Sequence, residues 1–124
     1  MKHELFGEIS FSMGWKTKKT IRLSNNEFNV ILKIKAYFED DGIASEQEKS
    51  YEEFLDNEMV ILKKIDELLE KNNYAIKERI IPKTLLISRD GSIALLCDDK
   101  EEPDEGIAVC IMPEMKIVSQ DDYL

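Results

Sequence analysis

The first third of the chain alternates apolar and polar residues with a period of two. Residues 9–13 and 18–23 both show this alternation, which is typical of half-buried strands. The clearest case is residues 28–38, where one face is almost wholly apolar: Phe28, Val30, Leu32, Ile34, Ala36 and Phe38. Ser24-Asn25-Asn26-Glu27 precedes it, and asparagine tolerates the positive φ of a tight turn. We therefore predict strands joined by a turn at 24–27, with the strand 28–38 central in a sheet.

The period changes to three or four residues between residues 46 and 71. Ser45-Glu46-Gln47-Glu48 matches a capping box, in which the first and last side chains bond each other's backbone amides. An apolar stripe follows at helical spacing: Tyr51, Phe54, Leu55, Met59, Leu62, Ile65, Leu68 and Leu69. Asn72-Asn73 is suited to end a helix. We predict one long helix over about 46–71. Its length of about 39 Å exceeds one small sheet, which allows for a kink or break near Asn57.

The last third returns to strand patterns. Residues 84–88 and 92–97 flank Arg89-Asp90-Gly91, which is a strong hairpin signal. Residues 106–112 alternate again until Pro113, and 116–118 would form a last short strand. This order predicts an α+β fold in a single domain over 1–124: a twisted, mostly antiparallel sheet with the long helix packed on one face. The strand order cannot be read from the pattern. The predicted core combines both regions: Val30, Leu32, Ile34, Phe54, Leu62 and Ile65.

The charge of the chain is strongly negative and unevenly spread. The formal net charge is −9 over 124 residues. Residues 1–37 hold seven basic and three acidic residues, a net charge of +4, whereas 38–124 hold ten and twenty-three, a net charge of −13. Such a chain repels nucleic acid and attracts basic proteins, although acidic residues also serve solubility alone. No apolar run is long enough to span a bilayer, and no signal-peptide pattern follows Met1. We expect a cytoplasmic protein with neither a membrane nor a nucleic-acid partner.

Residues suited to catalysis are scarce. The single histidine, His3, stands near a terminus that is prone to fray, so we expect a solvated side chain. No other general base is available to a serine or cysteine nucleophile, and the glycines are too isolated for a phosphate-binding loop. Cys97 and Cys110 each lie within an apolar run and are expected to be buried, free thiols. We therefore predict no enzyme activity, with no catalytic, cofactor-binding or metal-binding residues.

The most concentrated feature is an acidic segment after the hairpin. It contains Asp98, Asp99, Glu101, Glu102, Asp104 and Glu105. Three interpretations remain open: a solvated loop, a docking surface for a basic partner, and a divalent-cation site, although EF-hand spacing is absent. A carboxylate pair for glycoside hydrolysis has little support, because few aromatic residues accompany Trp15. As a docking surface, the segment is predicted to act together with Asp121 and Asp122 of the tail.

Trp15 and the lysines around it allow two interpretations. Tryptophan between Gly14 and Lys16 is suited to core or edge packing, but it is also a frequent interface anchor, and we include Trp15 among the predicted partner-binding residues. Lys16, Lys18 and Arg22 would share one strand face. They could contact nucleic acid, which the overall charge opposes, or they could protect a strand edge from aggregation.

The order of these features resembles a group of small bacterial immunity domains. The resemblance covers about residues 10–120 and includes Trp15, the strand 28–38, Gln47 ahead of Phe54, and Asp104-Glu105-Gly106. Similar sequences often have histidine before that glycine. This chain has Glu105, so a role for the imidazole is not carried over. The resemblance implies an inhibitor that binds a cognate toxin domain, which we expect to be basic, such as a nuclease. The alternative is a cytoplasmic accessory or regulatory binding domain. In either case we expect a monomer or weak dimer.

Overall fold

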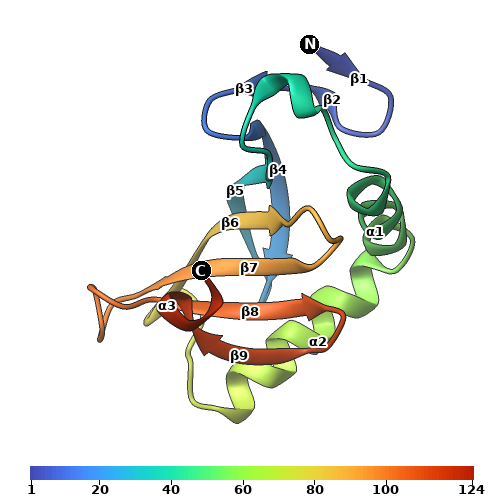
Figure 1. Cartoon of the computed structure of the whole chain (residues 1–124). Coiled ribbons are helices and arrows are strands. Elements are labelled where there is room, and N and C mark those ends of the chain that lie inside the picture. Colours follow the sequence, from blue (N-terminus) through green and yellow to red (C-terminus); the bar gives the residue numbers. More distant parts are fainter.

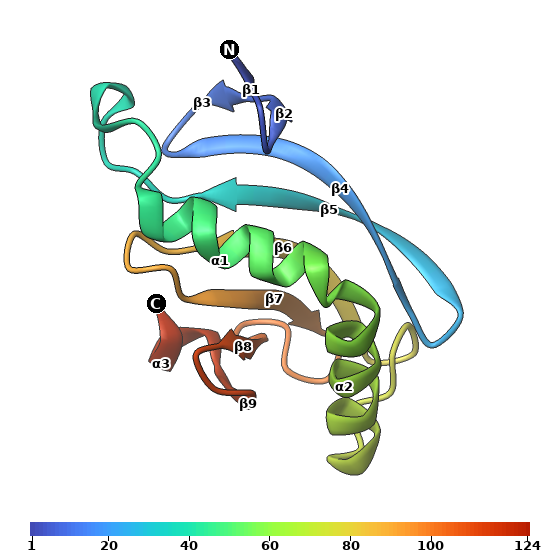
Figure 2. The same cartoon turned by 90° about the vertical axis from the view of Figure 1, so that its right-hand side faces the viewer.

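The computed structural model describes all residues, 1–124, and shows an α+β fold. Seven strands form one twisted sheet in the order β3-β4-β5-β6-β7-β8-β9, and two consecutive helices cover one face (Figures 1 and 2). The strands are β1 Lys2–His3, β2 Gly7–Glu8, β3 Ser10–Phe11, β4 Trp15–Leu23, β5 Asn26–Ile34, β6 Ile80–Ile87, β7 Ile93–Asp99, β8 Ile107–Met112 and β9 Lys116–Ser119. The helices are α1 Ser45–Asp56, α2 Glu58–Lys71 and the short α3 Gln120–Tyr123, with a 3₁₀ turn η1 at Glu39–Asp41.

The sheet is mostly antiparallel, as predicted, with one exception. β5 and β6 are parallel and adjacent, with Ile31 opposite Thr84 and Ile34 opposite Ile87. A parallel pair needs a crossover rather than a hairpin, and α1 and α2 supply it. The strands of the sheet therefore lie in the order of the sequence. Neighbouring strands run in opposite directions except at β5 and β6, which the helices connect.

The β4–β5 hairpin confirms the predicted turn but shortens the second strand. Ser24 and Asn25 both have positive φ, and the register runs from Leu23 opposite Asn26 to Trp15 opposite Ile34. The predicted strand extended to Phe38, but β5 ends at Ile34 and Phe38 is 71% exposed. The chain leaves the sheet after Ile34 because it must turn towards α1. The alternation of apolar residues in the sequence extends four residues further, to Phe38, without strand pairing.

The predicted single helix is two helices separated at Asn57. The Asn57 backbone leaves the helical region at φ −121° and ψ 17°, and its side-chain amide donates to the Glu53 carbonyl at 2.9 Å. An asparagine side chain that takes a carbonyl in this way competes with continued helix formation. Figure 2 shows α2 bending away from α1 as both follow the twisted sheet.

The first helix begins one residue earlier than predicted. Ala44, not Ser45, is the capping residue, and its N–H donates to the Gln47 side-chain oxygen at 2.9 Å. The Ser45 hydroxyl instead donates to the Glu46 carboxylate at 3.4 Å. Half of a capping box is thus present, displaced by one residue, and it depends on Gln47 rather than Glu48.

The core lies between the helices and one face of the sheet. Of the six predicted core residues, Val30, Leu32, Ile34, Phe54 and Ile65 are buried in one cluster, whereas Leu62 is only half-buried. The buried residues of α2 are Ile61, Ile65 and Leu69, which recur every four residues and continue the buried face of Tyr51 and Phe54 in α1. Ile61 is buried in place of Leu62, and Met59 is 87% exposed.

The hairpin predicted at Arg89–Gly91 is present between β6 and β7. The Asp90 carboxylate accepts the Ser92 N–H at 2.9 Å, which lowers the pKa of Asp90. Gly91 has φ +91°, and a Cβ at this position would stand 3.0 Å from the Glu46 carbonyl. Only glycine lets this turn approach the start of α1 so closely.

Candidate partner-binding surface

The acidic loop between β7 and β8 is an ordered structure. The Glu102 N–H donates to the Asp99 carbonyl at 3.1 Å, and the amides of Glu105 and Gly106 both donate to the Glu102 carbonyl, at 3.0 and 3.3 Å. Asp98, Glu101, Glu102, Asp104 and Glu105 are all exposed around these turns. We call these five residues the acidic surface. Their backbone is held in place while their carboxylates face solvent.

Asp99 belongs to the core of the loop and not to its surface. Its side chain is 3% exposed and accepts two hydrogen bonds from Arg79, from Nε at 2.9 Å and from Nη2 at 3.0 Å. The Arg79 guanidinium also lies 4.6 Å from the centre of the Tyr74 ring. Asp99 was predicted as a partner contact, but the structure places it beneath the surface, paired with Arg79. A carboxylate at the end of β7 is buried because an arginine 20 residues earlier neutralises it.

The far end of the loop is locked by the C-terminal segment. The Gln120 side-chain amide donates to the Cys97 carbonyl at 2.8 Å, and the Gln120 N–H donates to the Gly106 carbonyl at 3.3 Å. A Cβ on Gly106, which has φ +42°, would stand 2.5 Å from the Gln120 amide nitrogen. The glycine in Asp104-Glu105-Gly106 is thus explained by close packing against the tail.

The tail carboxylates only partly join the acidic surface. Asp121 and Asp122 are exposed on α3, whose first residue touches the loop through Gly106. Asp122, however, lines a hollow together with Ser92 and Lys116, towards the opposite end of β7 and β8. The tail therefore begins beside the acidic loop, but Asp122 does not extend the loop into one continuous patch.

Trp15 is a packing residue. Its side chain is 4% exposed, and its ring meets Phe11 edge-on with the ring centres 5.2 Å apart. Its indole N–H is buried without a hydrogen-bond partner. Trp15 was predicted as a partner contact, but the structure places it in the core, as the alternative interpretation expected.

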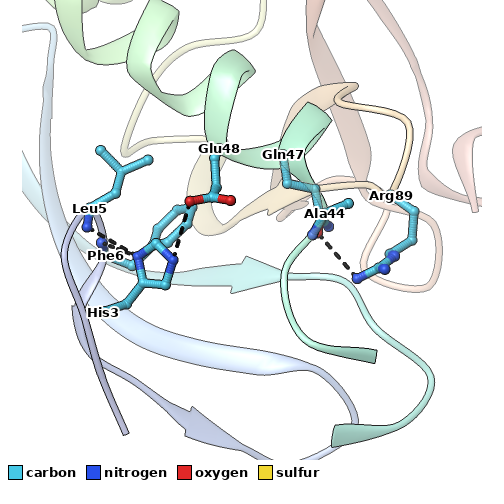
Figure 3. Close-up of polar contacts among 7 residues, drawn as sticks. All are labelled: His3, Leu5, Phe6, Ala44, Gln47, Glu48 and Arg89. Carbon is cyan, nitrogen blue, oxygen red and sulfur yellow. Dashed lines mark hydrogen bonds and ion pairs between the residues drawn. The ribbon is translucent and has the colours of Figure 1, made fainter. Parts of the chain in front are cut away.

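His3 is not the solvated residue expected near a terminus. Its Nδ1 accepts the amides of Leu5 and Phe6 at 3.0 and 3.4 Å, and its Nε2 lies 3.5 Å from a Glu48 carboxylate oxygen (Figure 3). Phe6 stacks in turn on Tyr51 of α1, with ring centres 4.8 Å apart. These contacts dock the N-terminal segment on the first helix. They occupy both ring nitrogens, so the role they support is structural.

Gln47 is a buried polar residue for which the sequence predicted only a place in the helix cap and in the family resemblance. It is 0% exposed, and its amide donates to the carbonyls of Lys35 at 2.9 Å and Ile87 at 3.1 Å. Its oxygen accepts the Ala44 amide, and Arg89 lies 3.4 Å away (Figure 3). Gln47 therefore joins the ends of the parallel strands β5 and β6 to the start of α1. Its position before the apolar stripe was the only sequence signal for it.

The groups suited to nucleophilic or metal chemistry are not arranged for it. Burial raises the pKa of the Cys97 thiol to about 12, with the nearby Asp98 charge adding to this effect, and burial also raises the pKa of Cys110. Both thiols are free. No group of three or more histidine, cysteine, aspartate or glutamate side chains is placed to hold a metal ion, so the cation interpretation of the acidic loop lacks a ligand set.

We expect an Asp99→Asn variant to melt at a lower temperature than the parent at neutral pH, and to approach it in acid. The hydrogen bonds from Arg79 lower the pKa of Asp99 in the folded state. A carboxyl with a depressed folded pKa contributes stability above its unfolded pKa and loses that contribution as the pH falls through the folded value. Melting temperatures of both proteins between about pH 7 and about pH 2 would test this. A difference that stays constant over that range would contradict the assigned ion pair.

Neither the membrane criterion nor the comparisons with known proteins identify a function for this chain. No helix has both the length and the apolar character needed to cross a membrane. Comparisons of the chain with protein-family models, curated proteins and solved structures gave no match.

Proposed function

We propose that this chain is an immunity protein that binds and neutralises a cognate bacterial toxin domain in the cytoplasm. The expected toxin domain is basic at its contact surface, as a nuclease would be. The observation that carries the proposal is the ordered acidic surface, Asp98, Glu101, Glu102, Asp104 and Glu105, at the end of β7 and on the loop after it, which is held at both ends. The resemblance to small immunity domains is its second support.

The order of the loop makes it better suited to binding than a mobile acidic segment would be. Binding by a flexible segment costs conformational entropy, and a segment already held in one conformation avoids most of that cost. Arg79 fixes the start of the loop through Asp99, and Gln120 fixes its end through the carbonyls of Gly106 and Ile107. The Lys100 ammonium donates to the Lys77 carbonyl at 2.9 Å and forms no ion pair with the carboxylates of the acidic surface. Glu101 pairs with Arg79 at 3.4 Å, whereas Asp98, Glu102, Asp104 and Glu105 form no ion pair, so these four carboxylates act together on an approaching basic protein.

A second candidate function is an accessory or regulatory binding domain without catalytic activity. It draws on the same acidic surface and differs in its partner. Co-expression separates the two. Where a reading frame beside this one encodes a large secreted protein, its C-terminal domain would be expressed with and without this chain. Rescue of growth and co-purification of the two proteins support immunity. Toxicity that persists in the presence of folded chain would overturn it.

Reversing three charges of the acidic surface is expected to slow association with a basic toxin domain. In a Glu102→Lys, Asp104→Lys, Glu105→Lys variant the on-rate should fall roughly tenfold or more at low salt, because steering depends on the summed field. A single Asp104→Asn change should have little effect. Asp99 is left intact, since changing it would disturb the fold. Stopped-flow association at several salt concentrations measures the effect.

The matched control places the same charge change elsewhere. Glu52, Glu67 and Glu70 are exposed on the helices, so a Glu52→Lys, Glu67→Lys, Glu70→Lys variant has the same net charge as the loop variant. Equal on-rates for the two triple variants would mean that net charge alone matters, and that the acidic loop is not the docking surface.

A further inference from the structure

One edge of the sheet is open along most of β4. β3 pairs with β4 only at Lys16 and Trp15, so it covers only the start of that strand. Residues 17–23 pair with β5 on one side, and their backbone groups make no hydrogen bond on the other side. Figure 2 shows β4 as the long outer strand beyond the helices. An open edge of seven residues presents free N–H and C=O groups to any extended chain that lies beside it.

An apolar groove runs beside this edge, at the break between the two helices. Its volume is about 530 Å³, and β4 contributes Thr20, Ile21 and Arg22 to its lining. The helices contribute Leu55, Met59 and Val60, which are 37%, 87% and 55% exposed. Exposed large apolar side chains in a group are typical of interaction sites, and here they adjoin unpaired backbone. The two features together match the requirements of an added strand: a hydrogen-bonding edge, and a pocket for alternate side chains.

The charges around the edge select which strand would fit. Lys16 and Lys18 share the face of β4 that points away from the helices, and neither forms an ion pair. Lys19 faces the helices and pairs with Glu58 at 3.2 Å. On the face of β4 that borders the groove, the charge of Lys19 is therefore neutralised by Glu58, and Asp56 also lines the groove. An incoming strand along residues 17–23 would place acidic side chains against Lys18 and near Lys16, whose direct cross-strand position is taken by Ser10 of β3, and apolar side chains in the groove.

A second copy of this chain fits the edge poorly. If two β4 strands paired antiparallel about Thr20, Lys18 of one copy would lie opposite Arg22 of the other. Like charges directly opposite each other in a sheet are destabilising. Lys18, which favours an acidic strand, thus opposes self-pairing in this register, although Glu27 pairs with Arg22 and offsets part of the repulsion.

We propose that residues 17–23 of β4 and the groove of Leu55, Met59 and Val60 bind an extended segment of another protein as an added strand. The segment alternates acidic and apolar residues. This site is separate from the acidic surface and does not depend on a toxin being the partner.

A synthetic peptide of alternating valine and glutamate tests the site directly. We expect it to bind the parent chain in fluorescence anisotropy and to slow hydrogen exchange at those amides of residues 17–23 that point away from β5. The matched valine–lysine peptide should bind at least about tenfold more weakly, because each cross-strand charge pair changes from attraction to repulsion. A valine–glutamate peptide N-methylated on alternate residues should not bind, because it cannot complete the ladder.

Variants of exposed residues separate the edge and groove from general charge effects. Lys16→Glu with Lys18→Glu, and separately Met59→Glu, should each weaken binding of the valine–glutamate peptide by about tenfold. Lys63 and Lys64 are exposed on α2, so Lys63→Glu with Lys64→Glu is the charge-matched control and should bind as the parent does. The proposal is overturned by absence of binding, by equal binding of the N-methylated peptide, or by equal loss in the control. Exchange protection at 17–23 that rises with protein concentration alone would assign the edge to a second copy instead.

Discussion

Replacing Phe54 by alanine is expected to lower the free energy of unfolding by about 3 to 5 kcal/mol. Phe54 is 0% exposed and lies where α1 faces the sheet, with its ring stacked 6.0 Å from that of Tyr51. The Lys19 ammonium also lies 5.7 Å from the ring centre. Removing the ring leaves a cavity that the surrounding strands and helix can only partly fill, so the loss exceeds the transfer energy alone. Urea denaturation measures it.

Two variants on the second helix serve as controls for this prediction. Met59→Ala removes a side chain that is 87% exposed and should change stability by less than about 0.5 kcal/mol. Leu62→Ala, at a half-buried position, should cost less than Phe54→Ala. If Met59→Ala lowered the free energy of unfolding as much as Phe54→Ala, then Met59 would have to be packed against the sheet, which contradicts the helix orientation described.

Replacing Gln47 by alanine is expected to cost on the order of 2 kcal/mol or more, because each buried polar group left without a partner costs about 1 to 3 kcal/mol. The Ala44 amide would lose its acceptor and the Lys35 carbonyl would lose its donor. The Ile87 carbonyl would still accept the Lys35 amide, so it is not orphaned. The change should loosen the contact between the start of α1 and the ends of β5 and β6, and hydrogen exchange at Ala44 would report it.

Gln47→Glu distinguishes hydrogen bonding from packing. Glutamate has nearly the same shape, but an ionised carboxylate cannot donate to the two carbonyls and would bury a charge. We expect it to be no more stable than Gln47→Ala at neutral pH. Glu52→Ala, at an exposed position of the same helix, is the control and should be nearly neutral. A Gln47→Glu variant as stable as the parent would show that the amide donors do not matter.

The local patterns of the sequence determined the elements and the fold class. Period-two alternation located the strands, and a period of three to four located the helical region. The turns at Ser24-Asn25 and at Arg89–Gly91 were recognisable because they depend on the backbone preferences of a few neighbouring residues. The same is true of Asn57, where a side chain competes for a nearby carbonyl. For the site, the sequence located the acidic loop and the glycine that closes it, both of which are local features.

Tertiary contacts decided which residues of these elements are accessible. Asp99 and Trp15 were predicted as partner contacts, but Asp99 is neutralised by Arg79 and Trp15 is covered by the core. His3 and Gln47 meet residues from other elements, the latter joining Lys35 and Ile87, which are far apart in the chain. A charge or an aromatic ring has the same local pattern whether it is paired, buried or free. Its role depends on which residue, distant in the chain, the fold places beside it. A single sequence does not show which distant residues meet.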